Sequence, residues 1–353
     1  MDNHTNHEMM HPVGSQPAWS ESYYFNFVDP TSKIGMFTRM GFRPGDGWAD
    51  ALHVVYLPNQ RVAFTYARRN IEHDLSLYDH NLKVGGLDIQ CVSPHQLWSI
   101  NYTGPAQNIA DASVLLQRSK LRPKGWFTPA NLDMSLNFDC ITEPYHSHST
   151  DGSTGAFGHF EQSGHVRGSI TVDDNTWTVD GFGVRDKSWG PRDWGASQRK
   201  QGTSPDDQAK SEDKDTQTRF STPASPRPFV NWFSMNFGAD SALGGSCFRQ
   251  PNGELKGAGW IQQDGLSMPL RKVVITTAYQ ANSILHDQVT LTSTIDGGED
   301  VRITGNMLNV CPTKVPMANG ATFINEGLAE FDWDGKKGFG IAEHWHAVAL
   351  SKT

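Results

Sequence analysis

The chain has 353 residues, of which 37% are hydrophobic and 19% charged, and its formal net charge is −8. This length and composition predict a globular protein with enough core for two domains or one large one. The negative charge, with no basic stripe to offset it, excludes a general nucleic-acid role, and no apolar run approaches the length of a membrane span.

The N-terminal residues and the cysteines predict a cytoplasmic protein that begins with a flexible tail. Residues 1–20 lack the charged segment and apolar run of a secretory signal. We expect residues 1–19, with His4, His7 and His11, to form a mobile tail rather than a metal site. The four cysteines lie far apart, without a C-x-x-C pair, which favours reduced thiols over disulfides or a structural zinc site.

Alternating polar and apolar residues predict a first β-domain over residues 20–196. Blocks typical of helices are scarce, and Gly and Pro turn signals separate short strands, as in an antiparallel barrel or sandwich. Residues 111–119 fit a strand or a short helix. The expected strands cover residues 19–28, 34–42, 51–57, 61–68, 75–78, 87–92, 97–102 and 132–142.

A hairpin near the end of this domain leads into an unusual charged and aromatic run. Residues 159–172 and 176–180 alternate on either side of an Asp-Asp-Asn turn, as in a half-buried antiparallel hairpin. The second arm continues through Gly-Phe-Gly into RDKSWGPRDW at 185–194. The Arg and Asp side chains are costly to bury as unpaired ions. The tryptophans, in turn, are rarely left exposed on a solvated turn. The run therefore predicts a partly enclosed site with an acid among indole rings.

The remaining sequence predicts a linker and a second β-domain. Residues 197–228 are polar and nearly free of large apolar side chains, so we expect a mobile insertion or linker. Residues 229–353 return to short alternating strands with turn signals between them. Two β-blocks of similar size predict two barrels or sandwiches side by side.

Asp186 is the leading candidate for a general acid or base in the charged run. Arg185 and Arg192 would hold charge and contact the substrate, while Trp189 and Trp194 would line the pocket. An alternative stays open, in which the run is a corner closed by ordinary ion pairs, with the tryptophans in the core.

Further candidates lie on either side of the run. His159 and Glu161 share one strand face and could reach a pocket as acid, base or substrate ligand; the alternative is an outward polar face. Near the C-terminus, Glu343 and Trp345 share a face, so Glu343 is another acid–base candidate and Trp345 a substrate contact. The alternative there is a hydrated strand end.

A metal site is the other chemistry that the sequence allows. His146 and His148 have a spacing that can chelate zinc, but we interpret their segment as pocket lining or a plain loop, and we predict no bound metal and no cofactor. We predict no nucleophile elbow, P-loop, dinucleotide fingerprint or H-E-x-x-H helix, because the H-E-x-x-H string at 7–11 falls in the expected mobile tail. This disfavours the enzyme classes that carry these motifs.

The run GVRDKSWG at 183–190 resembles the Asp-x-x-Trp-Gly signature of the lipocalin-like two-domain family that includes AttH-like proteins and carotenoid 1,2-hydratases. The wider pattern G-x-G-x-R-D-x-S-W-G-P-R-D-W is similar to that of uncharacterised bacterial relatives, and EQSGHVRG at 161–168 matches a second stretch. The resemblance covers most of residues 20–346. Its motifs are more specific for a fold than for a reaction.

This resemblance implies an all-β fold of two lipocalin-like (calycin-type) antiparallel barrels packed side by side, with an apolar ligand pocket near their junction. It also implies protonation of a carbon–carbon double bond of an isoprenoid and capture of the cation by water. By position Asp186 would donate the proton, with Trp189 and Trp194 stabilising the cation. Arg185 departs from the apolar or aromatic residue of the better-known branches, and it favours an ionised Asp186. The alternative donors are Glu161, His159 and Glu343.

The sequence therefore predicts a cofactor-independent acid–base enzyme whose partner is a hydrophobic, terpenoid or steroid-like small molecule. Hydration or dehydration is the leading reaction. A cyclase, isomerase or pericyclase would use the same pocket, and a non-catalytic carrier of a hydrophobic ligand is the alternative from another class.

Overall fold

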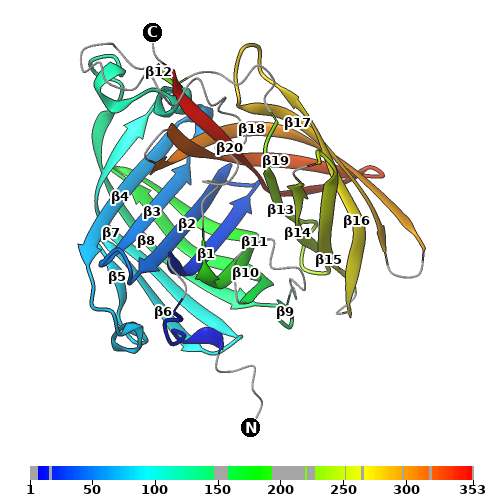
Figure 1. The fold of residues 1–353 in the computed structure, drawn as a ribbon, viewed down its shortest axis with the longest axis horizontal. Coiled ribbons are helices and arrows are strands. Elements are labelled where there is room, and N and C mark those ends of the chain that lie inside the picture. The colour runs from blue at the N-terminus through cyan, green and yellow to red at the C-terminus, as the bar shows by residue number, and fades with distance from the viewer. Residues whose placement is uncertain are drawn as a thin grey trace.

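A computed structural model describes residues 7–15, 18–146, 158–192, 219–220, 227–250, 252–263, 266–295, 298–317 and 320–351. The chain forms two antiparallel barrels that lie side by side (Figure 1). The predicted all-β fold of two lipocalin-like barrels is confirmed.

The first barrel is a ring of strands in the order β4–β3–β2–β1–β11–β10–β8–β7, closed by pairing of β4 with β7. Strands β5 and β6 extend the sheet beyond β7, and β9 pairs with β10. The strands are β1 (Trp19–Asp29), β2 (Ile34–Arg43), β3 (Trp48–Tyr56), β4 (Val62–Asn70), β5 (Leu82–Val84), β6 (Leu87–Ser93), β7 (Leu97–Ile109), β8 (Thr128–Cys140), β9 (Tyr145–His146), β10 (Gly158–Val172) and β11 (Asn175–Pro191).

The second barrel is a ring in the order β20–β13–β14–β15–β16–β17–β18–β19, closed by pairing of β19 with β20. The short strand β12 pairs with the end of β20. The strands are β12 (Arg219–Phe220), β13 (Val230–Asn236), β14 (Ser241–Arg249), β15 (Leu255–Gln263), β16 (Leu266–Tyr279), β17 (His286–Ile295), β18 (Asp300–Met317), β19 (Gly320–Trp333) and β20 (Lys336–Ser351).

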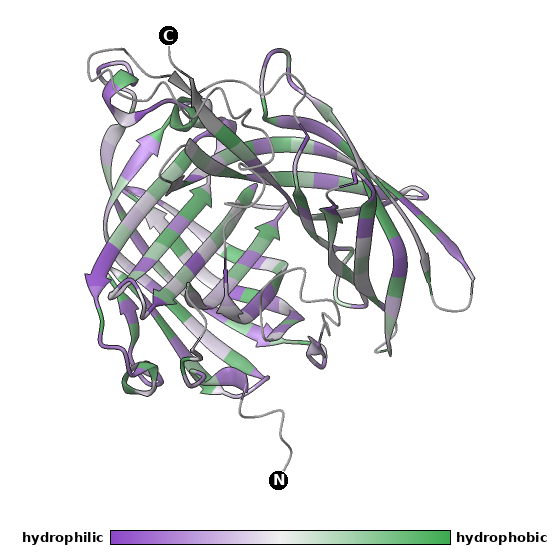
Figure 2. Cartoon of the chain, in the orientation of Figure 1, coloured by the Kyte–Doolittle hydropathy of each residue, from purple (hydrophilic) through white to green (hydrophobic). Residues whose placement is uncertain are grey.

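Four apolar clusters are found among the described residues. One fills the first barrel, one fills the second, one lies between the barrels with residues from both, and a small one joins Ile284 to β19 and β20. Hydrophobic and hydrophilic residues follow one another along the strands (Figure 2) because successive side chains point to opposite faces. Every residue of β1 is nevertheless buried, since the first barrel's core covers one face and the second barrel covers the other.

The contact between the barrels is also polar. Asn26 donates a hydrogen bond to Ser234 Oγ over 3.0 Å and accepts one from the backbone N–H of Val184 over 3.1 Å. Ser163 donates to Asn236 Oδ1 over 3.2 Å. Buried polar groups need such partners, so these bonds fix how the two barrels face each other.

The hairpin of β10 and β11 matches the sequence pattern, with Val172 opposite Asn175 across a tight turn. Asp173 adopts a φ of +52°, which Asp tolerates better than most residues. The second arm extends as strand to Pro191 rather than ending near residue 180. The charged run is therefore part of the sheet, and its side chains alternate between two faces.

Two short segments differ from the expected strands. Residues 75–78 form a 3-10 helix, η3 (Leu75–Tyr78), because the Asp74 side chain accepts the backbone N–H of Ser76 and caps it. The ambiguous segment at 111–119 contains the 3-10 helix η4 (Ala112–Leu116), capped in the same way by Asp111. Local hydrogen bonds of Asp compete with strand pairing at both places.

The N-terminal segment packs more closely than a mobile tail would. Among residues 7–15, Glu8 is buried and forms a two-pronged ion pair with Arg185, whose side chain points into the first barrel. Residues 1–6 and most of the expected linker at 197–228 lie outside the described residues. No helix in the described ranges is long and apolar enough to cross a membrane.

Candidate functional site

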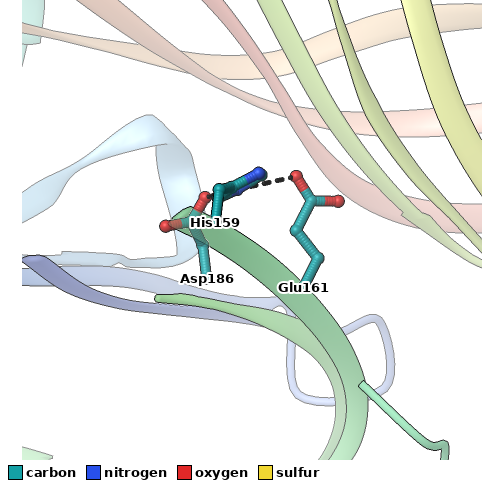
Figure 3. A group of neighbouring side chains, drawn as sticks. All are labelled: His159, Glu161 and Asp186. Atoms are coloured by element: carbon teal, nitrogen blue, oxygen red, sulfur yellow. Dashed lines mark hydrogen bonds and ion pairs between the residues drawn. The ribbon is translucent and has the colours of Figure 1, made fainter. Parts of the chain in front are cut away.

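The hairpin of β10 and β11 brings three predicted residues together on its outer face, toward the second barrel. Glu161 on β10 pairs directly with Asp186 on β11. His159 lies two residues before Glu161, so strand alternation places it on the same face. Figure 3 shows the His159 ring close to both carboxylates.

His159 contacts both acids through one ring nitrogen. Its Nε2 lies 2.5 Å from Asp186 Oδ2 and 3.4 Å from Glu161 Oε1. Burial acts to lower the pKa of His159, but the charge and hydrogen bond of Asp186 and the charge of Glu161 outweigh it, so the pKa is raised. The imidazolium form is therefore favoured at this position.

Glu161 is held by two tryptophans of the second barrel. Trp232 Nε1 donates to its Oε1 and Trp260 Nε1 to its Oε2, each over 2.6 Å. The close approach needs Gly244, where an added Cβ would lie 2.5 Å from Glu161 Oε2 and 2.6 Å from the Trp260 indole. The carboxyl is 2% exposed, so the second barrel both orients it and removes it from water.

The pKa of Glu161 is raised above its ordinary value. Burial raises it most, and the charge of Asp186 adds to this, while His159 and the two indole N–H groups oppose it. A carboxyl whose pKa moves toward neutrality is suited to taking up and giving back a proton.

A second pair of carboxyls lies beside this group, on β19 and β20. Glu326 and Glu343 are cross-strand neighbours joined by a hydrogen bond. The Tyr24 hydroxyl donates to Glu326 Oε2 over 3.1 Å, and the Trp345 indole donates to Glu343. Burial and then the charge of Glu343 raise the pKa of Glu326 well above its ordinary value. Two buried carboxyls in contact do not readily both ionise, so the pair holds a shared proton.

Arg192 connects the two groups electrostatically. Burial lowers its pKa, and the charges of Asp186 and Glu343 oppose that change. Its guanidinium donates to Ser188 Oγ over 2.7 Å, which keeps it at the end of β11. The predicted residues that the structure brings to this region are His159, Glu161, Asp186, Arg192, Glu343 and Trp345.

Other predicted residues lie on the opposite face of the hairpin. Arg185 points into the first barrel, where it pairs with Glu8. Trp189 also faces inward and stacks on His11 with ring centroids 3.9 Å apart. His146 lies against Phe160, on the inner side, with ring centroids 5.3 Å apart. Arg185 therefore does not lie beside the Asp186 carboxylate, although the two residues are adjacent in sequence.

Two predicted residues, Trp194 and His148, fall outside the described residues. The indoles that contact the acids, Trp232 and Trp260, were missed because only packing of the second barrel reveals them. Glu326 was missed for the same reason, and so was Tyr24. The one available signal was the alternation in each strand, which places Trp232 and Glu343 on outward faces.

The arrangement could also hold a metal ion. Among the residues that the structure describes, His159, Glu161 and Asp186 form the one group of His, Cys, Asp or Glu whose ligand atoms lie within 4.8 Å of one another. One imidazole and two carboxylates can bind several divalent metals. The metal-free site thus stays a prediction.

Several solved structures of other proteins align with this chain over most of its length. A crystal structure of an AttH-type protein from Nitrosomonas europaea aligns with a TM-score of 0.52 at 11% identity, covering 95% of this chain and 94% of that one. The structure of CghA gives 0.51 and 11%, with 96% and 90% covered. Kievitone hydratase from Nectria haematococca gives 0.49 and 11%, with 98% and 94% covered.

At this identity, the likeness to the AttH-type protein and to CghA shows a shared fold. A comparison with curated protein sequences gives no significant match. A model of a domain of unknown function, DUF7064, matches residues 4–209 and 226–348. The match spans most of both barrels, and the chain therefore belongs to the DUF7064 family.

Proposed function

We propose that the chain is an acid–base enzyme that adds water to, or removes it from, a hydrophobic small molecule bound between the two barrels. One observation carries this proposal: a single nitrogen of His159 lies between Asp186 and the buried Glu161. Such chemistry needs an acid and a base in contact, and here burial raises the pKa of the Glu161 carboxyl while Asp186 raises that of His159.

Hydration would begin at His159. The imidazolium gives its Nε2 proton to one alkene carbon, and the electron pair of the double bond forms the new C–H bond. Water attacks the resulting tertiary cation through oxygen, and its surplus proton passes to the Glu161 carboxylate. The proton returns to His159 across the 3.4 Å contact, which resets the site.

Dehydration is the same path in reverse. Protonated Glu161 assists the leaving hydroxyl, and neutral His159 removes the proton from carbon. In both directions Asp186 acts as the charge partner that stabilises the imidazolium, as a carboxylate beside a catalytic histidine does. In hydration His159 is therefore the proton donor, and Asp186 is its charge partner.

A hydrophobic substrate is supported by the surroundings of the acids. The cluster between the barrels is largely apolar and aromatic, and Trp232 and Trp260 belong to it. Such surroundings favour an apolar body with few polar groups. The resemblance of the run at 183–190 to the hydratase-containing family supports a terpenoid or steroid-like substrate.

A second candidate reaction, cyclisation or isomerisation, is favoured by the burial of Glu161. A base that is 2% exposed and bonded at both oxygens suits removal of a proton from carbon as well as from water. The same proton transfer from His159 would start this reaction, and no water would enter the product.

The test is a screen of terpenoid and steroid alkenes and alcohols for products that differ by one water. Hydration in ¹⁸O water labels the new hydroxyl, whereas isomerisation in D₂O labels only carbon. Asp186→Asn should greatly reduce turnover and spare ligand binding. A variant that keeps its full biological effect without turnover would instead indicate a carrier, and full turnover by Asp186→Asn would contradict acid–base chemistry at this site.

A further inference from the structure

The second barrel encloses polar side chains that the proposed reaction does not use. His344 and His346 alternate along β20 with Glu343 and Trp345, so they point into the barrel while Glu343 and Trp345 point out of it. Each of these two histidines is 1% exposed, and His286 on β17 is fully buried. Tyr279, at the end of β16, lies beside them.

These imidazoles are poorly satisfied by the protein itself. Within the described ranges, neither ring nitrogen of His344 or of His346 has a hydrogen-bond partner. His286 donates from Nε2 to the Ala342 carbonyl over 2.8 Å and leaves Nδ1 unpaired. Buried polar groups without partners are costly and rare, so several in one place point to a missing occupant.

The three rings are neighbours inside the barrel. The ring centroids of His286 and His344 are 4.1 Å apart, and those of His344 and His346 are 6.3 Å apart. A zinc–nitrogen bond of about 2.1 Å places a ligand's ring centroid about 3.2 Å from the metal, so two ligands lie about 4.5–5.2 Å apart at angles from 90° to tetrahedral. The first separation is shorter and the second longer than this range, so binding one ion requires the rings to rotate.

The chemical state of the group also suits a metal. All three imidazoles are almost completely buried, and burial favours their neutral form. The charges that act on His344 come from His286 and His346, with no carboxylate among them. Neutral imidazole is the form that binds metals.

We propose that the interior of the second barrel binds one divalent transition metal of the zinc class through His286, His344 and His346, with the Tyr279 hydroxyl beside them. The Nε2 bond of His286 to a backbone carbonyl leaves Nδ1 as its ligand atom, an orientation common among metal-binding histidines. The ring nitrogens of the three do not yet converge as closely as the ligand atoms of His159, Glu161 and Asp186 do. His344 and His346 have no hydrogen bond that would resist a small rotation.

The test uses the full-length protein, stripped with a chelator and titrated with Zn²⁺ and Co²⁺, with bound metal measured by elemental analysis. Wild type should bind one equivalent, and bound Co²⁺ should give the visible absorption of a nitrogen-ligated site. The double variant His344→Gln/His346→Gln should lose more than the roughly 10–100-fold of affinity that follows loss of a ligand's outer hydrogen-bond partner.

Two control variants test whether the metal binds elsewhere in the chain. Glu161→Gln/Asp186→Asn removes the carboxylates of the other convergent group, and His7→Gln/His11→Gln removes the hydrogen-bonded histidine pair near the N-terminus. Both variants should keep the metal. Loss of metal in either control, or no binding by wild type, overturns the proposal. NMR of the histidine rings needs no variant: Zn²⁺ should shift the signals of His286, His344 and His346 and leave those of His159 unchanged. The result is independent of the proposed reaction, which uses none of these three residues.

Discussion

The hairpin of β10 and β11 carries two His–Asp pairs with the same cross-strand offset, and only one of them lies under the second barrel. His159 pairs with Asp186, whose side chain is 17% exposed, and His165 pairs with Asp180, whose side chain is 72% exposed. Trp232 and Trp260 cover the group at His159 and bind its neighbour Glu161. Packing of the second barrel, rather than the hairpin sequence, therefore turns a surface ion pair into a candidate catalytic group.

The largest expected effect distinguishes these two pairs by turnover. Asp186→Asn leaves His159 without its charge partner, so the rate should fall by roughly 10²–10⁴-fold, the range for loss of acid–base catalysis. Asp180→Asn is the matched control, and it should leave the rate within about twofold of wild type. Equal losses in the two variants, measured as kcat/KM on a substrate from the screen, would contradict the distinction.

The pH dependence of activity should be set by Glu161 and His159. Glu161 must be ionised to accept a proton, so activity should fall as the pH drops through its raised pKa, above 4.5. His159 must be protonated, so activity should also fall as the pH rises through its raised pKa, above 6.5. The profile of kcat/KM should be bell-shaped, and Glu161→Gln should remove its acid limb.

The same shift has a consequence for stability. Because the folded-state pKa of His159 is raised, its ion pair stabilises the fold fully below the unfolded pKa of 6.5, and this stabilisation disappears as the pH rises through the folded-state value. Chemical denaturation at a series of pH values should show the loss in wild type. Asp186→Asn should show a smaller loss over the same interval, and an unchanged loss would contradict the assignment.

Gly244→Ala should disturb the contact between Glu161 and the Trp260 indole. The added methyl would lie 2.5 Å from the Glu161 carboxylate and 2.6 Å from Trp260, so one of them must shift. We expect a loss of about 1–3 kcal/mol in the free energy of unfolding, the usual cost of overpacking. Gly45→Ala is the matched control, because Gly45 has open space around it and, like Gly244, no left-handed φ.

The smallest effect should come from the uncovered pair. His165→Asn removes a partly exposed contact with Asp180, and exposed ion pairs contribute about 0–1 kcal/mol. Its free energy of unfolding should therefore stay close to that of wild type. A loss as large as that of Gly244→Ala would show that exposure is not what separates the two pairs.

The sequence could predict the hairpin and the two-barrel fold because alternation and the run at 183–190 are local signals. It also singled out His159, Glu161 and Asp186, which the strand register brings together. It could not predict that Trp232 and Trp260 would reach Glu161, because that contact joins residues far apart in the chain. Trp189 was expected beside Asp186, but the run stays in a strand and alternation turns that ring inward.

The raised pKa of His159 beside Asp186 can be tested directly by an NMR titration of the His159 ring, which needs no substrate. The site as described predicts a pKa above the ordinary value of 6.5 in wild type. It predicts a lower pKa in Asp186→Asn, where only the charge of Glu161 still opposes the effect of burial. A wild-type pKa at or below 6.5, unchanged by that substitution, would contradict the account.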